Sequence, residues 1–407
     1  MTMENNRRIT IVGGGFGGLF AAINLTEAGT VTLISREDHF LFTPMLYEYL
    51  SGEVLEWQIA PRYKELLGNE INFVRGEVTD IDFGSREITI AGQESRALYD
   101  ILIIAVGSMT NYENIEGAEQ YAMPFRQLKH ADALRERLTE ALDRVPPDSA
   151  PEDAREALTV AVVGGDASGI ELSTKIADLL RAAFKRRGLP GEPRIIIIEE
   201  SNEVGHGMSD DLRATIEDAL KRARVEVQTE TKVMRVTAGG LQIEHNKKAQ
   251  EIRAAAVIWA GGVKANTLVE KLGLERDEKG LLKVEDTLQA RGHDRVFALG
   301  DIAHYINADE GLGGTAQLAY REAGLVAENV RALLNGKPLR MEHFEELGEA
   351  ISLGIKSAAL ELDGRIVDGA LGREARFAMY ALRLPTWRQR FRVAPKWILG
   401  GSNPRPL

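Results

Sequence analysis

Two short apolar segments, far apart in the chain, each run directly into a glycine-rich loop. Ile9–Val12 precede Gly13, and Val160–Val163 precede Gly164. A segment that is apolar at every position is typical of a parallel strand buried on both faces of a sheet. Three further segments end in glycine in the same way: Ile101–Val106, Val257–Ala260 and Val296–Leu299. The repeat predicts an α/β fold with two nested Rossmann-like domains.

The first loop, Gly13-Gly14-Gly15-Phe16-Gly17-Gly18, satisfies the G-x-G-x-x-G pattern. Its context completes a βαβ unit, because apolar residues follow at helical spacing and Val31–Ile34 form a second strand. In such a unit Gly13, Gly15 and Gly18 allow a tight turn, close approach of the backbone to a pyrophosphate and close helix–strand packing. The start of the helix adds amide donors and the positive end of its dipole. We therefore expect this loop to bind the pyrophosphate of FAD.

The adenosine end of this site departs from the usual pattern. An Asp or Glu is expected after the second strand, where it accepts a hydrogen bond from the ribose, but Ser35 and Arg36 stand there. A serine hydroxyl can also bond a ribose, so we predict that Ser35 and Arg36 contact the cofactor. Glu37 takes this role if the loop is shifted along the chain.

The second loop, Gly164-Gly165-Asp166-Ala167-Ser168-Gly169, lies between a strand and a helix and predicts a second dinucleotide site. The next strand, Ile195–Ile198, is followed by Glu199. An acidic residue there accepts from the ribose of NADH and repels the 2′-phosphate of NADPH. We therefore expect NADH to bind at this loop.

Asp166 occupies a loop position at which a glycine lets the backbone approach phosphate. Its charge adds to those of the phosphates, and at a surface-like dielectric two unit charges about 4 Å apart repel by ~4 kcal/mol. Two interpretations stay open. Either NADH binds more weakly or slightly displaced, or the site is degraded, with another reductant or no turnover.

Further motifs follow the two loops: His39–Glu48, Ala105–Ser108, Ile258–Val263, Phe297–Asp301 and Thr315–Gln317. With the loops they extend from about residue 8 to residue 335. Together they resemble the type II NADH dehydrogenases, the single-chain NADH:quinone oxidoreductases among the flavoproteins with two dinucleotide-binding domains. The resemblance implies two half-reactions. NADH reduces the flavin, and the flavin passes two electrons to a quinone without proton pumping.

The loops and the resemblance together predict the cofactor contacts. On the FAD side these are Gly13, Gly15, Phe16, Gly17, Gly18, Ser35, Arg36, Thr43, Pro44, Val78, Ala105, Gly107, Asp301, Ala316 and Gln317. On the NADH side they are Gly164, Gly165, Ser168, Gly169, Glu199 and Gly262. Asp301 is expected to accept from a ribitol hydroxyl of FAD, and a helix cap is its alternative role.

Two residues are predicted to take part in the reaction. Glu171 matches a family glutamate near the flavin and the nicotinamide, which implies nicotinamide positioning and proton handling; the alternative is an ordinary first-turn glutamate favoured by the helix dipole. Gln317 and the residue before it open a helix toward the flavin, and in the family this pair also lines the quinone site. The family usually has two glutamines after the pair. Tyr320, Arg321 and Glu322 stand here instead, so the type of quinone stays open.

Three regions are predicted along the chain. A discontinuous FAD-binding domain comprises residues 1–118 and 280–335, and an NADH-binding domain comprises residues 119–279. Residues 336–407 form a C-terminal helical appendage that serves as an interface or attaches to a membrane.

The end of this appendage, Arg373–Leu407, has seven arginines and one lysine against a single glutamate. Trp387 and Phe391 share one helical face, and Pro385 and Pro395 are expected to divide the segment into short helices. A basic amphipathic segment with aromatic residues suits an anionic membrane surface, and the resembled family uses its C-terminus in this way. The alternatives are packing on the body of the protein and a homodimer contact.

Composition excludes several functions. The chain has no cysteine, which rules out sulfide:quinone oxidoreductases, disulfide reductases and thiolate metal sites. Scattered histidines and a net charge of -11 argue against a metal site and a nucleic-acid partner. No signal segment or membrane span is expected, which predicts a cytoplasmic protein or one peripheral on the cytoplasmic face of the membrane. Two other functions stay open: a flavoprotein reductase of a protein electron carrier, and a flavin-binding regulatory protein with a degraded nicotinamide site.

Overall fold

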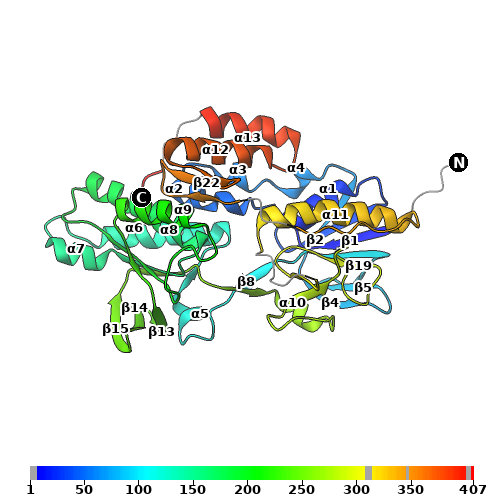
Figure 1. Ribbon diagram of the computed structural model, residues 1–407, viewed down its shortest axis with the longest axis horizontal. Helices are drawn as coiled ribbons and strands as arrows, with labels where there is room; N and C mark the ends of the chain where they lie inside the picture. Colours follow the sequence, from blue (N-terminus) through cyan, green and yellow to red (C-terminus); the bar gives the residue numbers. More distant parts are fainter. Residues whose placement is uncertain (1–6, 308–313, 345–347, 400–404) are drawn as a thin grey trace. The chain divides into compact units, whose positions relative to one another are not determined.

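The computed structural model describes residues 7–307, 314–344, 348–399 and 405–407 (Figure 1). The chain forms two compact units, each assembled from separate stretches. Unit 1 consists of Met1–Phe42, Ala60–Met109 and Val263–Glu346, and unit 2 consists of Thr43–Ile59, Thr110–Gly262 and Leu347–Leu407.

Unit 1 is built on a five-stranded parallel sheet in the order β19-β7-β1-β2-β3. Its strands are β1 (Arg8–Val12), β2 (Thr30–Ser35), β3 (Ile71–Arg75), β7 (Ile101–Ile104) and β19 (Val296–Ala298). Every residue of β7 is buried, as expected where both faces of a parallel sheet are covered. Two helices, α1 (Phe16–Asn24) and α11 (Ala316–Leu334), pack side by side (Figure 1).

Smaller elements also belong to unit 1. They are α4 (Tyr63–Leu66), α10 (Thr267–Lys271), an antiparallel sheet of β4 (Val78–Asp82), β5 (Glu87–Ile90) and β6 (Ala97–Leu98), and the pair β18 (Leu282–Val284) and β20 (Ala303–Tyr305). β20 follows β19 after a short turn, so the turn lies at the carboxyl end of a strand of the main sheet.

Unit 2 contains a second five-stranded parallel sheet, in the order β12-β11-β10-β16-β9. Its strands are β9 (Met123–Pro124), β10 (Thr159–Val163), β11 (Arg194–Ile198), β12 (Val225–Gln228) and β16 (Ala256–Trp259). The predicted fold class of two Rossmann-like sheets with C-terminal helices is confirmed, and each predicted apolar segment forms one of these buried strands.

Helices and a second sheet cover the main sheet of unit 2. The helices are α5 (Ala118–Tyr121), α6 (Leu128–Asp143), α7 (Pro151–Ala157), α8 (Ala167–Arg187) and α9 (Asp210–Arg222). The second sheet consists of β13 (Thr231–Thr237), β14 (Gly240–His245) and β15 (Lys248–Arg253). Val236, Leu241, Ile243 and Trp259 belong to the apolar core in this region.

Two further stretches belong to unit 2. The first contains the 3-10 turn η1 (Thr43–Met45), α2 (Leu46–Ser51) and α3 (Glu56–Ile59). The second contains the antiparallel sheet β21 (Ala350–Ser352), β22 (Ala358–Leu362) and β23 (Arg365–Val367), followed by α12 (Gly369–Leu382) and α13 (Trp387–Leu399). α12 packs against both β22 and α13 (Figure 1).

The bounds of the two units differ from those of the predicted domains. Thr43–Ile59 joins unit 2 because α2 packs on α8 and α6. Residues 263–279 join unit 1, and the predicted appendage 336–407 is divided between the two units. Sequence patterns mark where strands and helices occur but not which side chains attach a short helix to a neighbour.

The prolines of the C-terminal segment behave differently from each other. Pro385 lies between α12 and α13, as predicted. The prediction for Pro395 is wrong, because this residue lies inside α13 without ending it. A proline there removes one hydrogen bond, to the carbonyl of Phe391, and Phe391 is 77% exposed, so water can replace that bond. Residues 400–404 of the predicted tail lie outside the described residues.

Candidate functional site

The first glycine loop leaves the carboxyl end of β1, at the centre of the sheet of unit 1. Val12 is in register with Ile34 of β2 and with Ile104 of β7, so the residues that follow these strands meet at one edge. Gly13 has φ +106°, and an added Cβ would lie 2.2 Å from the carbonyl oxygen of Ala105. A Cβ on Gly18 would lie 1.8 Å from the carbonyl oxygen of Gly13. Only glycine fits these two positions.

Gly15 behaves differently, because a Cβ there would meet nothing within 4 Å. It is the N-cap of α1, whose first turn contains no acidic residue. Open space beside a helix start with an uncompensated positive dipole end fits an anionic pyrophosphate. The residues present therefore fit the phosphate end of FAD. The neighbouring Phe16 packs edge-on against Phe40 and Phe42 at ring-centroid distances of 5.0 and 5.2 Å.

The adenosine end of this loop contains a tyrosine that sequence patterns did not reveal. The hydroxyl of Tyr63, on α4, donates to the carbonyl oxygen of Gly14 at 2.6 Å. Burial raises the pKa of Tyr63, and a hydrogen bond with Ser35 opposes this shift. Ser35 thus has a protein partner at the end of β2. Arg36 is exposed and lies 4.0 Å from Glu77. Tyr63 is outside the glycine motif and no spacing rule connects it to the loop.

Asp301 lies at the same edge of the sheet, in the turn between β19 and β20. The hydroxyl of Ser108 donates to its Oδ2 at 2.5 Å. The residue before it, Gly300, has φ +75°, and β20 rather than a helix follows the turn. α11 begins nearby in sequence at Ala316, with Gln317 as its second residue; the hydroxyl of its N-cap, Thr315, accepts from a backbone N–H of the first turn.

The other predicted FAD contacts are placed as follows. Gly17 lies in the first turn of α1, with its would-be Cβ 2.9 Å from Leu299. Ala105 is buried, and Gly107 has φ +67°. Val78 is the buried first residue of β4. These residues belong to unit 1, whereas Thr43 and Pro44 form η1 in unit 2.

The second glycine loop repeats the stereochemistry of the first. Gly164 has φ +103°, and an added Cβ would lie 2.6 Å from the Cα of Gly261. A Cβ on Gly169 would lie 1.9 Å from the carbonyl oxygen of Gly164. Val163, before the loop, is in register with Ile198 and with the last residue of β16. The loop therefore lies at the carboxyl end of the central strand of its sheet, where dinucleotides bind in doubly wound folds.

Asp166 causes no backbone strain in this loop. It is the N-cap of α8 with φ -74° and ψ 178°, close to the φ -69° and ψ -163° of Gly15 in the first loop. The residue is exposed, yet partial shielding by the surrounding chain raises the pKa of its carboxyl. Glu199 raises this pKa further and His206 lowers it. Asp166 thus fits the backbone of the loop, and an anionic ligand would add to the repulsion that its carboxylate already has from Glu199.

Glu199 is held in place by the loop itself. Its Oε2 accepts from the backbone N–H of Gly165 at 2.6 Å, and its Oε1 accepts from that of Ser201 at 2.7 Å. A carboxylate has about four acceptor positions, so a ribose hydroxyl can still bond to it. Ser168 accepts from the hydroxyl of Tyr47 at 3.0 Å. Gly262 follows β16 with φ +66°.

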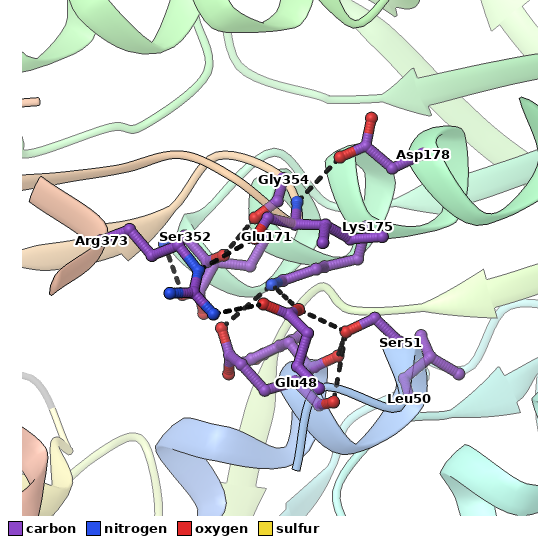
Figure 2. A network of polar contacts seen from close by, with 12 residues as sticks. Glu48, Leu50, Ser51, Glu171, Lys175, Asp178, Ser352, Gly354 and Arg373 are labelled. Atoms are coloured by element: carbon purple, nitrogen blue, oxygen red, sulfur yellow. Dashed lines mark hydrogen bonds and ion pairs between the residues drawn. The ribbon is translucent and has the colours of Figure 1, made fainter. Parts of the chain in front are cut away.

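Glu171 lies on α8 but points into the protein. It is 7% exposed, and its Oε1 accepts from the backbone N–H of Ser352 at 2.7 Å (Figure 2). The same oxygen accepts from Nη2 of Arg376 at 2.8 Å. Burial raises the pKa of Glu171 to about 7; Arg376 opposes this shift and Glu48 adds to it. The carboxyl can therefore gain or lose a proton near neutral pH.

Glu171 belongs to a buried ionic cluster of three carboxylates and three cations: Glu48, Glu53, Glu171, Lys175, Arg373 and Arg376. Their side chains are at most 11% exposed. The Nζ of Lys175 lies 3.2 Å from Glu48 (Figure 2). It also pairs with Glu53. Arg376 pairs with Glu48 at 2.6 Å, and Arg373 pairs with Glu53 at 3.3 Å.

The cluster shows how three stretches of unit 2 are tied together. Glu48 and Glu53 come from α2 and the turn after it, Lys175 from α8, and the two arginines from α12. Burial opposes ionisation of Glu48, but Arg376 and Lys175 hold its pKa below the ordinary value. Arg376 also donates to the carbonyl oxygen of Pro44 at 2.9 Å, which fixes η1. Removing one partner would leave an uncompensated buried charge.

Sequence reasoning missed this cluster. Arg373 and Arg376 counted there as part of a basic surface segment, and Glu48 stood in a motif without a role. Their spacing on one face of a helical pattern shows only that they point the same way. No sequence rule pairs them with residues far along the chain.

Some features are absent from the described residues. No group of three or more His, Cys, Asp or Glu side chains suited to a metal ion occurs among them. None of the helices in the described ranges is both long and apolar enough to cross a membrane.

Comparisons with known proteins identify relatives over nearly the whole chain. The demethylphylloquinone reductase of Synechocystis sp. is 33% identical, covering 96% of this chain and 95% of that protein. The type II NADH:quinone oxidoreductase Ndh of Mycobacterium tuberculosis is 31% identical, covering 83% and 75%. A solved structure of NDH2 from Plasmodium falciparum in complex with NADH superposes with a TM-score of 0.86 at 21% identity, covering 98% and 99%.

The family model described as pyridine nucleotide-disulphide oxidoreductase matches residues 7–323, a range that contains both glycine loops and Asp301. The two relatives, at 33% and 31% identity, agree with it. This chain therefore belongs to the pyridine nucleotide-disulphide oxidoreductase family, and its relatives over nearly full length are type II NADH:quinone oxidoreductases.

Proposed function

We propose that this protein is an FAD-dependent oxidoreductase that moves two electrons from NADH to a quinone. The observation that carries the proposal is the pair of glycine loops, each at the carboxyl end of the central strand of a parallel sheet and each closed to any residue but glycine at its tightest positions. The names of the relatives support NADH as donor and a quinone as acceptor. Two observations support FAD as the cofactor: the chain belongs to the pyridine nucleotide-disulphide oxidoreductase family, and the first glycine loop of unit 1 fits a pyrophosphate.

The residues of unit 1 would hold FAD along its length. Gly13, Gly15 and Gly18 would take the pyrophosphate at the start of α1, and Asp301 would accept from the ribitol. When bound, FAD supplies hydride acceptance and electron transfer to the quinone. The protein contributes position and electrostatics. The start of α11, at Ala316, would favour negative charge on the pyrimidine edge of the flavin.

The residues of unit 2 would hold NADH. Gly164 and Gly169 would allow the pyrophosphate to approach, and Glu199 would accept from the adenosine ribose and disfavour the 2′-phosphate of NADPH. The intact backbone of the loop around Asp166 supports weakened binding rather than a lost site.

Glu171 is proposed to handle the proton that quinone reduction consumes. A carboxyl with a pKa near the working pH is suited to give and regain a proton. The backbone N–H of Ser352 and the guanidinium of Arg376 both bond to Oε1 and fix the orientation of the group. Gln317, on α11, is proposed to line the quinone site.

The test is anaerobic addition of NADH to the purified protein while the visible absorbance of the flavin is recorded. We expect bleaching, and recovery of the absorbance when a menaquinone or ubiquinone analogue is added. A protein that holds flavin but does not bleach would refute the NADH donor. A reduced protein that small quinones do not reoxidise, but a protein electron carrier does, would refute the quinone acceptor.

One observation favours a second function. Asp166 places a carboxylate where the phosphates of NADH are expected, so a flavin-binding regulatory protein without nicotinamide turnover is the competing proposal. The bleaching experiment separates the two functions, because only the oxidoreductase is reduced by NADH.

The C-terminal helices are proposed to attach the protein to an anionic membrane surface. Leu382, Trp387 and Phe391 are 71%, 65% and 77% exposed, and Arg388 and Arg392 are exposed beside the two aromatic residues. This combination suits the interface of a membrane with anionic lipids. The opposite face of the segment is buried, so part of the tail packs within unit 2. A homodimer contact through the exposed face is the competing outcome.

A further inference from the structure

Glu322 is a buried carboxyl to which the proposed reaction assigns no role. It lies on α11, 1% exposed. Its Oε2 accepts from the backbone N–H of Gly300 at 2.6 Å, and its Oε1 accepts from the hydroxyl of Tyr305 at 2.6 Å. The carboxyl therefore connects α11 to the turn between β19 and β20, through Gly300, and to the last residue of β20, Tyr305.

That turn contains Asp301, the residue proposed to accept from the ribitol of FAD. Gly300 has a left-handed φ of +75°, and its N–H points to Glu322. A backbone N–H that is buried without an acceptor is costly, so the position of Glu322 fixes the conformation of the turn. The orientation of Asp301 depends on that conformation.

The charges around Glu322 make its own protonation state matter. Burial raises the pKa of Glu322 to about 7; the hydrogen bonds from Tyr305 and Gly300 lower it, and Asp301 raises it. Further out, Arg321 pairs with Glu342 at 3.8 Å, and both act on Tyr305.

One more charged pair near this turn joins β20 to a residue that precedes β18 in the chain. His304 pairs with Asp277 at 3.3 Å. As the neighbour of Tyr305 in a strand, His304 points to the opposite face. The pair of His304 and Asp277 therefore lies on the face of β20 opposite Tyr305 and does not hold the turn.

A bound ligand would strengthen the conflict between Glu322 and Asp301. A ligand that covers Asp301 removes water, and two nearby carboxylates repel more strongly in a medium of lower dielectric. The protonated form of Glu322 keeps the acceptor for Gly300 and carries no charge. Binding of FAD is therefore coupled to protonation of this carboxyl.

We propose that Glu322 is a positioning residue that holds the Gly300–Asp301 turn for FAD, and that FAD is bound more tightly when this carboxyl is protonated. The inference rests on the proposed FAD site of unit 1. Glutamine in place of Glu322 could make both hydrogen bonds but could not titrate.

The test is a titration of flavin-free protein with FAD at several pH values between 6 and 9, followed by the quenching of FAD fluorescence. For the wild-type protein we expect the dissociation constant to rise with pH. If FAD binding raises the pKa of Glu322 by one unit, the dissociation constant of FAD changes about tenfold between low and high pH. The variant E322Q should bind FAD with little dependence on pH across this range, and E322L should bind weakly at every pH.

A third variant keeps the test decisive if E322L does not fold. Y305F removes one hydrogen bond to the carboxylate without adding bulk or charge, so the pH dependence should move to higher pH. An E322Q variant with the pH dependence of the wild type, or a Y305F variant in which it does not move, would overturn this inference alone. A wild-type protein that binds no FAD at any pH would refute the proposed function and this inference with it.

Discussion

At the scale of single residues, the two glycine loops differ at one position that matters for chemistry. Gly15 and Asp166 have nearly the same backbone angles as helix N-caps, so the aspartate strains nothing in the protein. The difference is a negative charge where a phosphate is expected. The second residue is Glu171. A glutamate at the start of a helix is usually solvated, but Glu171 is buried among charged side chains.

Replacing Asp166 with glycine should strengthen NADH binding. The change removes a charge whose repulsion by one phosphate charge is ~4 kcal/mol at about 4 Å before screening, so we expect the dissociation constant of NADH to fall by about tenfold or more. Added backbone freedom should lower stability by roughly 0.5–1 kcal/mol. The measurement is anaerobic titration with NADH.

The matched control is D211G, which removes an exposed aspartate from the first turn of α9 in the same unit. It should leave NADH binding unchanged. Equal affinity of D166G and wild type for NADH would show that Asp166 does not meet the phosphates.

Replacing Glu171 with glutamine should change how stability depends on pH. The pKa of Glu171 is raised from 4.5 to about 7 in the folded chain. The stability linked to its protonation is therefore fully present below pH 4.5 and is lost as pH rises to 7. The loss is on the order of 3 kcal/mol. E171Q has no group that titrates here, so it should not lose this stability. The difference in Tm between E171Q and the wild type should therefore increase from pH 4.5 to 7 and stay constant at higher pH.

The control is E152Q, which replaces an exposed glutamate of α7. The difference between its Tm and that of the wild type should be the same at every pH. E171Q should also lower the rate of the second half-reaction, the reduction of quinone, by about 10²-fold. Unchanged hydride transfer and quinone reduction in E171Q would remove Glu171 from the mechanism.

At the scale of elements, α12 is attached by charge as well as by apolar packing. Phe377 and Tyr380 are buried on one face, and Arg373 and Arg376 reach the ionic cluster from the same helix. α13 is attached more weakly along its outer face, where Phe391 is exposed. The basic C-terminal sequence thus contains two different helices. Arg373 and Arg376 of α12 are buried in the ionic cluster, whereas Arg388 and Arg392 of α13 are exposed.

Replacing Arg376 with methionine should destabilise the protein by roughly 3–5 kcal/mol, because it leaves Glu48 buried without its closest cation. The double variant E48Q/R376M removes the charges of this pair and should recover part of the loss, because Glu171 is still without its arginine. R376K keeps the charge but not the fork that reaches Glu48, Glu171 and the carbonyl of Pro44, so its stability should be intermediate. Denaturant unfolding measures all three variants. A double variant no more stable than R376M would contradict the pairing.

At the scale of the whole molecule, charge is distributed unevenly along the chain. The net charge is -11, yet Arg373–Leu407 is strongly basic. Two of its arginines are neutralised inside the ionic cluster. Arg392 and Lys396 lie over the ring of Trp57 and remain exposed at the surface of α13. Arg388 of the same helix is also exposed. An acidic protein with a basic, aromatic C-terminal segment is suited to approach an anionic surface through that segment.

Flotation with lipid vesicles tests this distribution. We expect the protein to float with vesicles that contain phosphatidylserine at low salt, and to float less with neutral vesicles or at high salt. Each exposed basic residue contributes about 1 kcal/mol near such a surface. The variants W387A/F391A and R388Q/R392Q should both reduce flotation.

The control K185Q/R186Q removes two exposed charges at the end of α8 and should float like the wild type. Protein that stays in the soluble fraction at low salt would contradict membrane attachment. Loss of a dimer in W387A/F391A, measured by light scattering, would assign the exposed face to a homodimer.

Much of the fold followed from local patterns. The buried strands are marked by runs of apolar residues such as Ile101–Ile104. The loops are marked by glycines, at positions where the backbone leaves no room for a side chain. The positions of Gly13, Gly164, Glu199 and Asp301 at strand ends follow from the same patterns, because parallel strands end at a common edge. Pro395 shows the limit of such rules, since whether a proline ends a helix depends on what surrounds the lost hydrogen bond.

The sequence by itself determined that this chain has two dinucleotide folds, that no cysteine chemistry is available, and that glycine is required where two backbones touch. These properties depend on residues close together in the chain. Only the tertiary structure decided that Arg376 meets Glu48 and Glu171, that Tyr63 closes the first loop, and that Glu322 holds the turn at Asp301. Such contacts join residues far apart in sequence, and their energy depends on burial, which no local pattern specifies.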